Sequence, residues 1–126
     1  MAIAGIGTDI VEIARIEKAV ARQPRLVTRL LTEAEQQAYA VATHPVRYLA
    51  KRFAAKEAAL KALGTGLQNG LSWQHIEISN TPLGQPRLTF SGVAEQRAKE
   101  LQVHAIHLSL SDEANYAQAM VVLESA

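Results

Sequence analysis

The stretch Arg52-Phe-Ala-Ala-Lys-Glu-Ala-Ala-Leu-Lys61, followed closely by Gly64-Thr-Gly66, decides much of the expected fold. Its alanine content predicts a helix, and the glycine pair predicts where that helix ends. Because proline is tolerated in a first helical turn, the helix is expected to run from about Pro45 to about Leu63. Gly64 then acts as its C-terminal stop.

The charges in this helix lie close to its apolar side. At about 100° per residue, one apolar stripe contains Val46, Leu49, Phe53, Leu60 and Leu63. Lys56 falls inside the stripe, Glu57 lies on its edge, and Lys61 lies one turn further along beside Glu57. Charges near a core are costly to desolvate unless something pairs with them. Two interpretations stay open: a metal and a phosphate provide the pairing, or Glu57 and Lys61 form an ordinary i,i+4 surface pair.

The composition indicates one globular domain, residues 1–126, with a single core. The absence of cysteine excludes disulfides, thiolate metal sites and cysteine nucleophiles. No apolar run approaches the ~18 residues of a membrane helix. The N-terminus lacks the basic region of a signal peptide, so a cytoplasmic location is expected.

Basic residues are concentrated in the first half of the chain. Residues 1–63 hold ten Lys or Arg against six Asp or Glu, whereas residues 64–126 hold three against six. Arg15, Lys18 and Arg22 share one side of a predicted helix that ends near Arg22. This basic stripe is either a solvated face or a docking surface for an acidic helix or a nucleic acid.

A short buried strand is predicted over residues 2–8, and Gly5 and Gly7 lie within it. Glycine in a strand often marks the close approach of another backbone or a ligand. Asp9 is expected to end this strand and to open the following helix. One interpretation of Asp9 is a helix cap, because Asp9-Ile-Val-Glu12 has the capping-box spacing. The other is a Mg²⁺ ligand, with Glu57 as the best candidate for the second carboxylate.

The remaining patterns place helices early and antiparallel strands late. The expected elements are helices at 26–31, at 33–41 after the capping box Thr32-Glu-Ala-Glu35, and over about ten residues from Ser91, with hairpins at 75–90 and 103–123. The predicted fold class is therefore α+β, with N-terminal helices packed on a small antiparallel sheet. The turn Gly64-Thr65-Gly66 follows a lysine, as in loops that bind phosphate, although a plain helix cap explains Gly64 as well.

Three blocks taken together resemble the holo-[acyl-carrier-protein] synthase family, the short bacterial class of 4′-phosphopantetheinyl transferases. They are Gly5-Ile-Gly-Thr-Asp9-Ile-Val-Glu12, Arg52 to Lys61 with Gly64-Thr-Gly66, and His107-Leu-Ser-Leu-Ser111. They occur in the right order over nearly the whole chain. Their combination is specific, although each block alone is not.

The resemblance implies transfer of the phosphopantetheine arm of coenzyme A to a serine of apo acyl carrier protein, for fatty acid biosynthesis, with release of adenosine 3′,5′-bisphosphate. It implies Mg²⁺ as cofactor, bound by Asp9 and Glu57, and a homotrimer with sites between subunits. The residues it assigns are, for catalysis, Asp9, Glu57 and Lys61; for coenzyme A, Arg52, Lys61, Gly64, Thr65 and Gly66; and for docking of the acidic carrier, Arg15, Lys18 and Arg22. Neither a nucleic acid nor a membrane is expected as a partner.

One position departs from the family pattern. Many members carry histidine directly after the second serine of the late block, whereas this chain has Asp112. An aspartate cannot attract a phosphate as an imidazolium does, so no such role is carried over. The alternative to the enzyme is a non-catalytic module whose basic helix binds an acidic protein or a nucleic acid.

Overall fold

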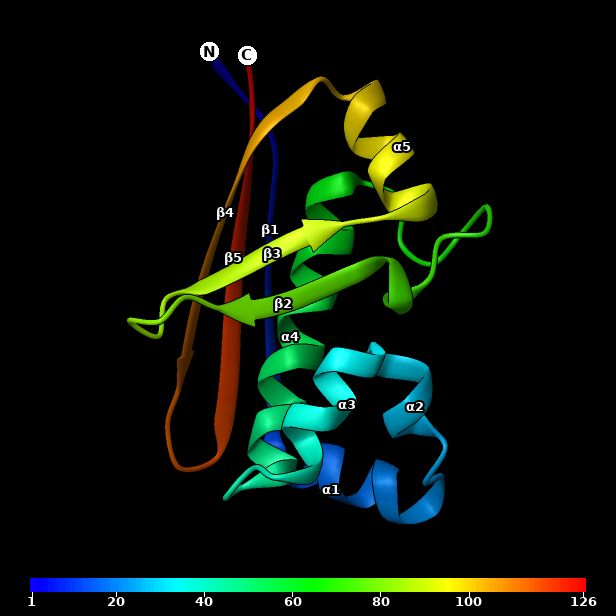
Figure 1. Ribbon diagram of the computed structural model, residues 1–126, viewed down its shortest axis with the longest axis vertical. Coiled ribbons are helices and arrows are strands. Elements are labelled where there is room, and N and C mark those ends of the chain that lie inside the picture. The colour runs from blue at the N-terminus through cyan, green and yellow to red at the C-terminus, as the bar shows by residue number, and fades with distance from the viewer.

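The computed structural model describes residues 1–126 and combines five helices with five strands (Figure 1). The helices are α1 (Ile13–Arg22), α2 (Leu26–Leu30), α3 (Glu33–Ala40), α4 (Pro45–Leu63) and α5 (Gly92–Glu100), with a 3₁₀ turn η1 (Trp73–His75). The strands are β1 (Ala2–Glu12), β2 (Ile76–Asn80), β3 (Pro86–Phe90), β4 (Val103–Asp112) and β5 (Tyr116–Ser125). The predicted α+β class is confirmed.

The strands form two separate antiparallel sheets. One has three strands in the order β1-β5-β4, and the other is the β2-β3 hairpin. Figure 1 shows α4 between them, with helices α1 to α3 gathered around its first half and α5 near the two chain ends. Ala2 pairs with Ser125, so the N- and C-termini lie side by side.

The core is built around the alanines of α4. Ala54, Ala55, Ala58 and Ala59 are completely buried and belong to one cluster that also contains residues of β2, β3, α5 and β5. Small side chains let the helix lie close to the sheet. A second cluster, containing Ile16, Leu30, Leu31 and Leu49, joins α1 and α2 to the first half of α4.

Strand β1 is longer than the sequence indicated. It continues through Asp9, which lies opposite Ala119, to Glu12, which lies opposite Tyr116. Ile10 is 62% exposed, so it belongs to the alternation of a strand and not to the apolar side of a helix. Pairing with β5 therefore keeps the chain extended up to Glu12, although Ile10, Ile13, Ile16 and Val20 recur at the spacing of a helix.

The cap interpretation of Asp9 is wrong for the same reason. Helix α1 begins at Ile13, its N-cap residue is Glu12, and no side chain caps it. The other helix signals agree better with the structure. The capping box of Thr32 and Glu35 is present, and Gly64 ends α4 in the left-handed conformation with φ of 76°. Ser91 occupies the N-cap position of α5 but makes no side-chain cap hydrogen bond.

Candidate active site

Strand β1 and helix α4 approach each other closely at two glycines. A Cβ atom added to Gly7 would lie 2.0 Å from the carbonyl oxygen of Ala58, and one added to Gly5 would lie 2.0 Å from that of Ala62. The sequence prediction of a close backbone approach is confirmed. Because side chains alternate along a strand, Asp9 lies on the same side of β1 as these glycines, toward α4.

Asp9 and Lys61 meet where the strand and the helix cross. The Nζ atom of Lys61 lies 3.2 Å from Oδ1 of Asp9 and donates to the carbonyl oxygen of Thr8 at 2.8 Å. The Asp9 side chain is 18% exposed and that of Lys61 is 58% exposed. Lys61 makes no ion pair with Glu57, so the i,i+4 surface pair is not formed.

Glu57 has a different partner. Its Oε2 atom accepts a hydrogen bond from the indole Nε1–H of Trp73 at 3.0 Å, and its side chain is partly buried. Glu57 lies one helical turn before Lys61, and the Ala58 backbone next to it contacts Gly7. The structure therefore brings Asp9 into contact with Lys61, one helical turn from Glu57, which the spacing in the sequence could not show.

Lys56 turns away from this crossing into the interior. Its fully buried ammonium donates to Oε1 of Glu35 at 2.6 Å and to the carbonyl oxygens of Leu30 at 2.7 Å and Trp73 at 3.1 Å. Burial lowers the pKa of Lys56, and the charge of Glu35 opposes that shift. The partner of Lys56 is thus a carboxylate of the protein and not a metal or a phosphate.

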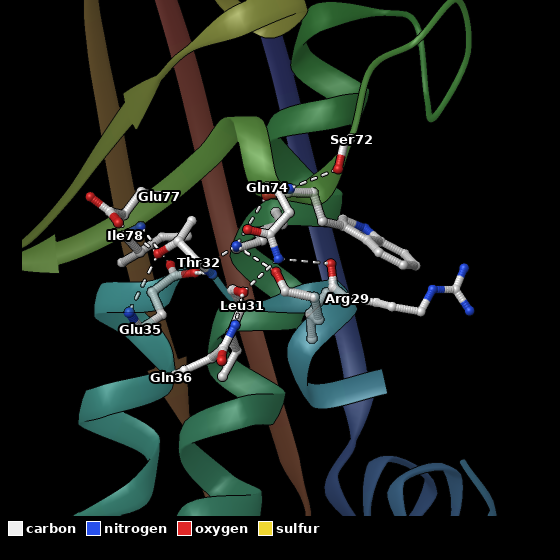
Figure 2. A network of polar contacts seen from close by, with 12 residues as sticks. Arg29, Leu31, Thr32, Glu35, Gln36, Ser72, Gln74, Glu77 and Ile78 are labelled. Carbon is white, nitrogen blue, oxygen red and sulfur yellow. Dashed lines mark hydrogen bonds and ion pairs between the residues drawn. The ribbon is translucent and has the colours of Figure 1, made fainter. Parts of the chain in front are cut away.

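Like Trp73 beside Glu57, Glu35 is a residue that the sequence reasoning missed. Besides Lys56, it accepts from the backbone N–H groups of Thr32 at 2.9 Å and Ile78 at 2.8 Å, which ties α3 to β2 (Figure 2). Beside it, the side-chain amide of Gln74 donates to the carbonyl oxygen of Leu31 at 2.6 Å (Figure 2). The capping box already accounted for Glu35, so no signal in the sequence pointed to a second, long-range role.

Within a single chain, the residues expected to contact coenzyme A do not all lie close to one another. Arg52 is buried, lies over the ring of Tyr48 at 4.5 Å, and donates to Oδ1 of Asn80 at 2.9 Å. It is nine residues before Lys61 on α4, which places the two on roughly opposite sides of the helix. Gly64 and Gly66 both have positive φ.

Two buried side-chain atoms in the chain have no hydrogen-bond partner, and both belong to this expected set. They are Nε of Arg52 and Oγ1 of Thr65. A buried polar atom without a partner is costly, and a bound ligand is one way to satisfy it.

The basic stripe lies on the exposed side of α1. Arg15, Lys18 and Arg22 are exposed, whereas Ile16 on the opposite side is buried. None of the three forms an ion pair within the chain. Their charges are therefore not neutralised by the protein itself.

Asp112 has a structural partner. It pairs with Arg47 at 2.9 Å, and Arg47 also donates to the carbonyl oxygens of Glu113 and Ala114. These contacts tie the β4–β5 turn to the start of α4. In the late block, His107, Ser109 and Ser111 are exposed on one face of β4, and Nε2 of His107 lies 3.2 Å from Oε1 of Glu124.

Comparison with known proteins identifies relatives over the full chain. The family model of the 4′-phosphopantetheinyl transferase superfamily matches residues 5–121. A holo-[acyl-carrier-protein] synthase of Shewanella sp. (strain W3-18-1) is 57% identical, with 99% of each chain covered.

Solved structures agree with this result. A holo-[acyl-carrier-protein] synthase of Neisseria meningitidis superposes with a TM-score of 0.91 at 40% identity, covering 98% of this chain and 99% of that one. The Bacillus anthracis enzyme, solved in complex with CoA (3′,5′-ADP), superposes with a TM-score of 0.84 at 38% identity, covering both chains completely. This chain therefore belongs to the 4′-phosphopantetheinyl transferase superfamily, as a member of its holo-[acyl-carrier-protein] synthase family.

Proposed function

We propose that this protein transfers the 4′-phosphopantetheine group of coenzyme A to a serine of an apo acyl carrier protein, leaving adenosine 3′,5′-bisphosphate. The similar enzyme of Bacillus anthracis was solved with CoA (3′,5′-ADP), which supports coenzyme A as the donor. Within the chain, the main support is the contact between Asp9 and Lys61 one turn from Glu57. The product is a holo carrier protein for fatty acid biosynthesis in the cytoplasm.

The proposed cofactor is Mg²⁺, held by Asp9 and Glu57. The chain contains no cluster of three His, Cys, Asp or Glu side chains that could hold a metal, and the proposed site has two carboxylates. Two carboxylates suit Mg²⁺, which takes its remaining oxygens from water and substrate phosphates. Lys61 contacts only Oδ1 of the Asp9 carboxylate, and no Lys or Arg side chain pairs with Glu57, so each residue keeps a carboxylate oxygen for the metal. Bound there, Mg²⁺ supplies positive charge to the transferring phosphoryl group.

The protein residues contribute charge and a base. Lys61 is more than half exposed, so its ammonium can reach a diphosphate oxygen and stabilise the charge that develops there. As the serine oxygen bonds to phosphorus, the bond to the leaving bisphosphate breaks and the serine proton must be removed. The proposed acceptor of this proton is either Glu57 or a water molecule next to it.

Coenzyme A is proposed to contact Arg52, Lys61 and the Gly64-Thr65-Gly66 turn. The unpartnered Nε of Arg52 and Oγ1 of Thr65 support this assignment. The positions of Arg52 and Lys61 on opposite sides of α4 favour a nucleotide site that a second subunit completes.

A homotrimer is the proposed assembly. The face of the β1-β5-β4 sheet that points away from α4 carries large apolar side chains that are between 42% and 63% exposed, namely Ile3, Ile6, Ile10, Tyr116 and Met120. Such a patch on paired strands is typical of a surface that another protein chain covers. Light scattering after size-exclusion chromatography measures the number of subunits.

The unpaired charges of Arg15, Lys18 and Arg22 are proposed to dock the acidic carrier protein. The rival function, a non-catalytic module that binds an acidic protein or a nucleic acid, also uses this stripe. The non-catalytic function gives no reason for Asp9 to contact Lys61 one helical turn from Glu57. No helix of the protein combines the length and apolar character needed to cross a bilayer.

Mass spectrometry of the carrier tests the proposal. Incubation with coenzyme A, Mg²⁺ and an apo carrier protein is expected to add the mass of one phosphopantetheine group to the carrier. Chelation of the metal by EDTA is expected to stop the reaction, and added Mg²⁺ to restore it. No mass gain under any of these conditions would favour the non-catalytic module.

A further inference from the structure

The indole N–H of Trp73 is the one hydrogen-bond donor that the protein provides to Glu57. Trp73 is also the only tryptophan of the chain. An indole N–H donates and cannot accept, and it carries no charge. The contact therefore fixes one oxygen of the carboxylate and leaves its negative charge intact.

Trp73 is itself held in place from several sides. Its carbonyl oxygen accepts from the buried ammonium of Lys56 at 3.1 Å. Oγ of Ser72, the residue before it, accepts from the backbone N–H of Gln74 at 3.0 Å and fixes the 3₁₀ turn. Its ring packs at a tilted angle on Phe53, with the ring centroids 6.1 Å apart. The position of the indole N–H is therefore set by the fold and not by Glu57.

Phe53 and Glu57 are four residues apart on α4, so they lie on the same side of the helix, one turn apart. The indole spans this turn, with its ring against Phe53 and its N–H on Glu57. The neighbouring cation, Lys56, points to Glu35 instead. An ammonium on Glu57 would compete with a metal for the carboxylate, whereas a neutral donor does not.

We propose that Trp73 is a positioning residue, whose indole N–H holds Oε2 of Glu57 so that Oε1 is presented to a divalent cation. A carboxylate with one oxygen held has fewer rotamers to lose when a metal binds. Partners that hold metal ligands typically contribute 10–100-fold to metal affinity. This inference rests on the proposed assignment of Glu57 as a metal ligand.

The test is the substitution Trp73→Phe, which keeps an aromatic ring against Phe53 and removes the N–H. Binding of Mn²⁺ alone, measured by isothermal titration calorimetry, is expected to weaken about 10-fold. The melting temperature should fall only slightly. The Mg²⁺ concentration that gives half-maximal transfer should rise to a similar extent, and high Mg²⁺ should restore kcat. Saturating metal should not rescue Glu57→Gln, because that variant lacks the charge itself.

Gln74→Met is the matched control. Gln74 lies in the same turn and donates to the carbonyl oxygens of Thr28 at 2.7 Å and Leu31 at 2.6 Å, so its loss loosens the turn from α2. It does not contact Glu57. This variant is expected to melt at a lower temperature and to bind Mn²⁺ as the wild type does. Mn²⁺ affinity within twofold of wild type in Trp73→Phe overturns the inference, and so does a wild type that binds no Mn²⁺.

The two proposals fail in different ways. If the wild type transfers phosphopantetheine and Trp73→Phe binds Mn²⁺ normally, the function stands and the role of Trp73 is refuted. If the wild type transfers nothing but its Mn²⁺ affinity still depends on Trp73, the role of Trp73 stands and the function is refuted. Trp73 fluorescence gives a second readout, because Mg²⁺ on Glu57 should alter the emission in the wild type and not in Glu57→Gln.

Discussion

Replacing Lys56 with methionine tests how much the buried ion pair of Lys56 and Glu35 stabilises the packing of α2 and α3 on the rest of the fold. Methionine matches the length of the lysine stem but removes an ammonium that donates to Glu35, to the Leu30 carbonyl and to the Trp73 carbonyl. The Glu35 side chain is only 1% exposed, so its charge would be left with two backbone N–H donors. Breaking a buried pair from one side typically costs about 3–5 kcal/mol. For a chain of this size that corresponds to a fall in melting temperature of roughly 10–20 °C.

Urea unfolding followed by circular dichroism measures this cost. The single variants Lys56→Met and Glu35→Gln and the double variant form a cycle, in which the double variant should be less destabilised than the sum of the two by about 2 kcal/mol or more. A loss below about 1 kcal/mol in Lys56→Met, with no coupling in the cycle, would refute the argument.

The pH dependence gives an independent check on the same pair. Because burial lowers the pKa of Lys56 in the folded state, the unfolded chain binds this proton more tightly. The contribution of Lys56 to the free energy of unfolding should therefore rise as pH increases through the lowered pKa toward the unfolded value of about 10.4. The stability difference between the wild type and Lys56→Met should widen over this range. A difference that narrows would contradict the direction of the shift.

Glu57→Gln should fold normally and lose about 100-fold or more of transfer activity, since it keeps the size of the side chain and removes its charge; near-normal turnover would refute the metal assignment. Asp9→Asn should likewise keep its melting temperature and lose activity, and retained activity would leave Asp9 with only its contact to Lys61. Arg22→Glu should raise the KM for the carrier several-fold, as should added salt in the wild type, with the KM for coenzyme A unchanged; the reverse pattern would place Arg22 at the nucleotide. Gly7→Ala should lower the free energy of unfolding by about 3 kcal/mol or more, because its Cβ would lie 2.0 Å from the Ala58 carbonyl oxygen. A melting temperature equal to that of the wild type would show that β1 and α4 can move apart to accommodate the methyl group.

Local patterns predicted most of the elements because each signal was contained within a few residues. The Thr32–Glu35 box, the proline of α4 and the glycine that ends it all act within one helical turn. Strand β1 was the exception. Spacing assigned its last residues, from Asp9 on, to the following helix, but pairing with a strand more than 100 residues away makes them part of β1.

The candidate site was predicted in part. The position of Lys56 and Glu57 near the apolar stripe indicated that these charges needed partners, but not which ones. The partners come from distant segments: Glu35 for Lys56 and Trp73 for Glu57. Contacts of this kind depend on how elements pack and leave no periodic signal in a single sequence. The resemblance to a family supplied the pairing of Asp9 with Glu57 that spacing alone could not.

The two glycines of β1, Gly5 and Gly7, also restrict the register in which this strand can pack on α4. A slip of the strand by one residue would turn Ile6 and Thr8 toward α4, where the carbonyl oxygens of Ala58 and Ala62 leave no room for a side chain. Only the register that faces both glycines to the helix can close the core, and that register is the one that points Asp9 at Lys61. Sterics therefore disfavour the slipped register. A chain that packs β1 correctly on α4 also places Asp9 correctly beside Lys61.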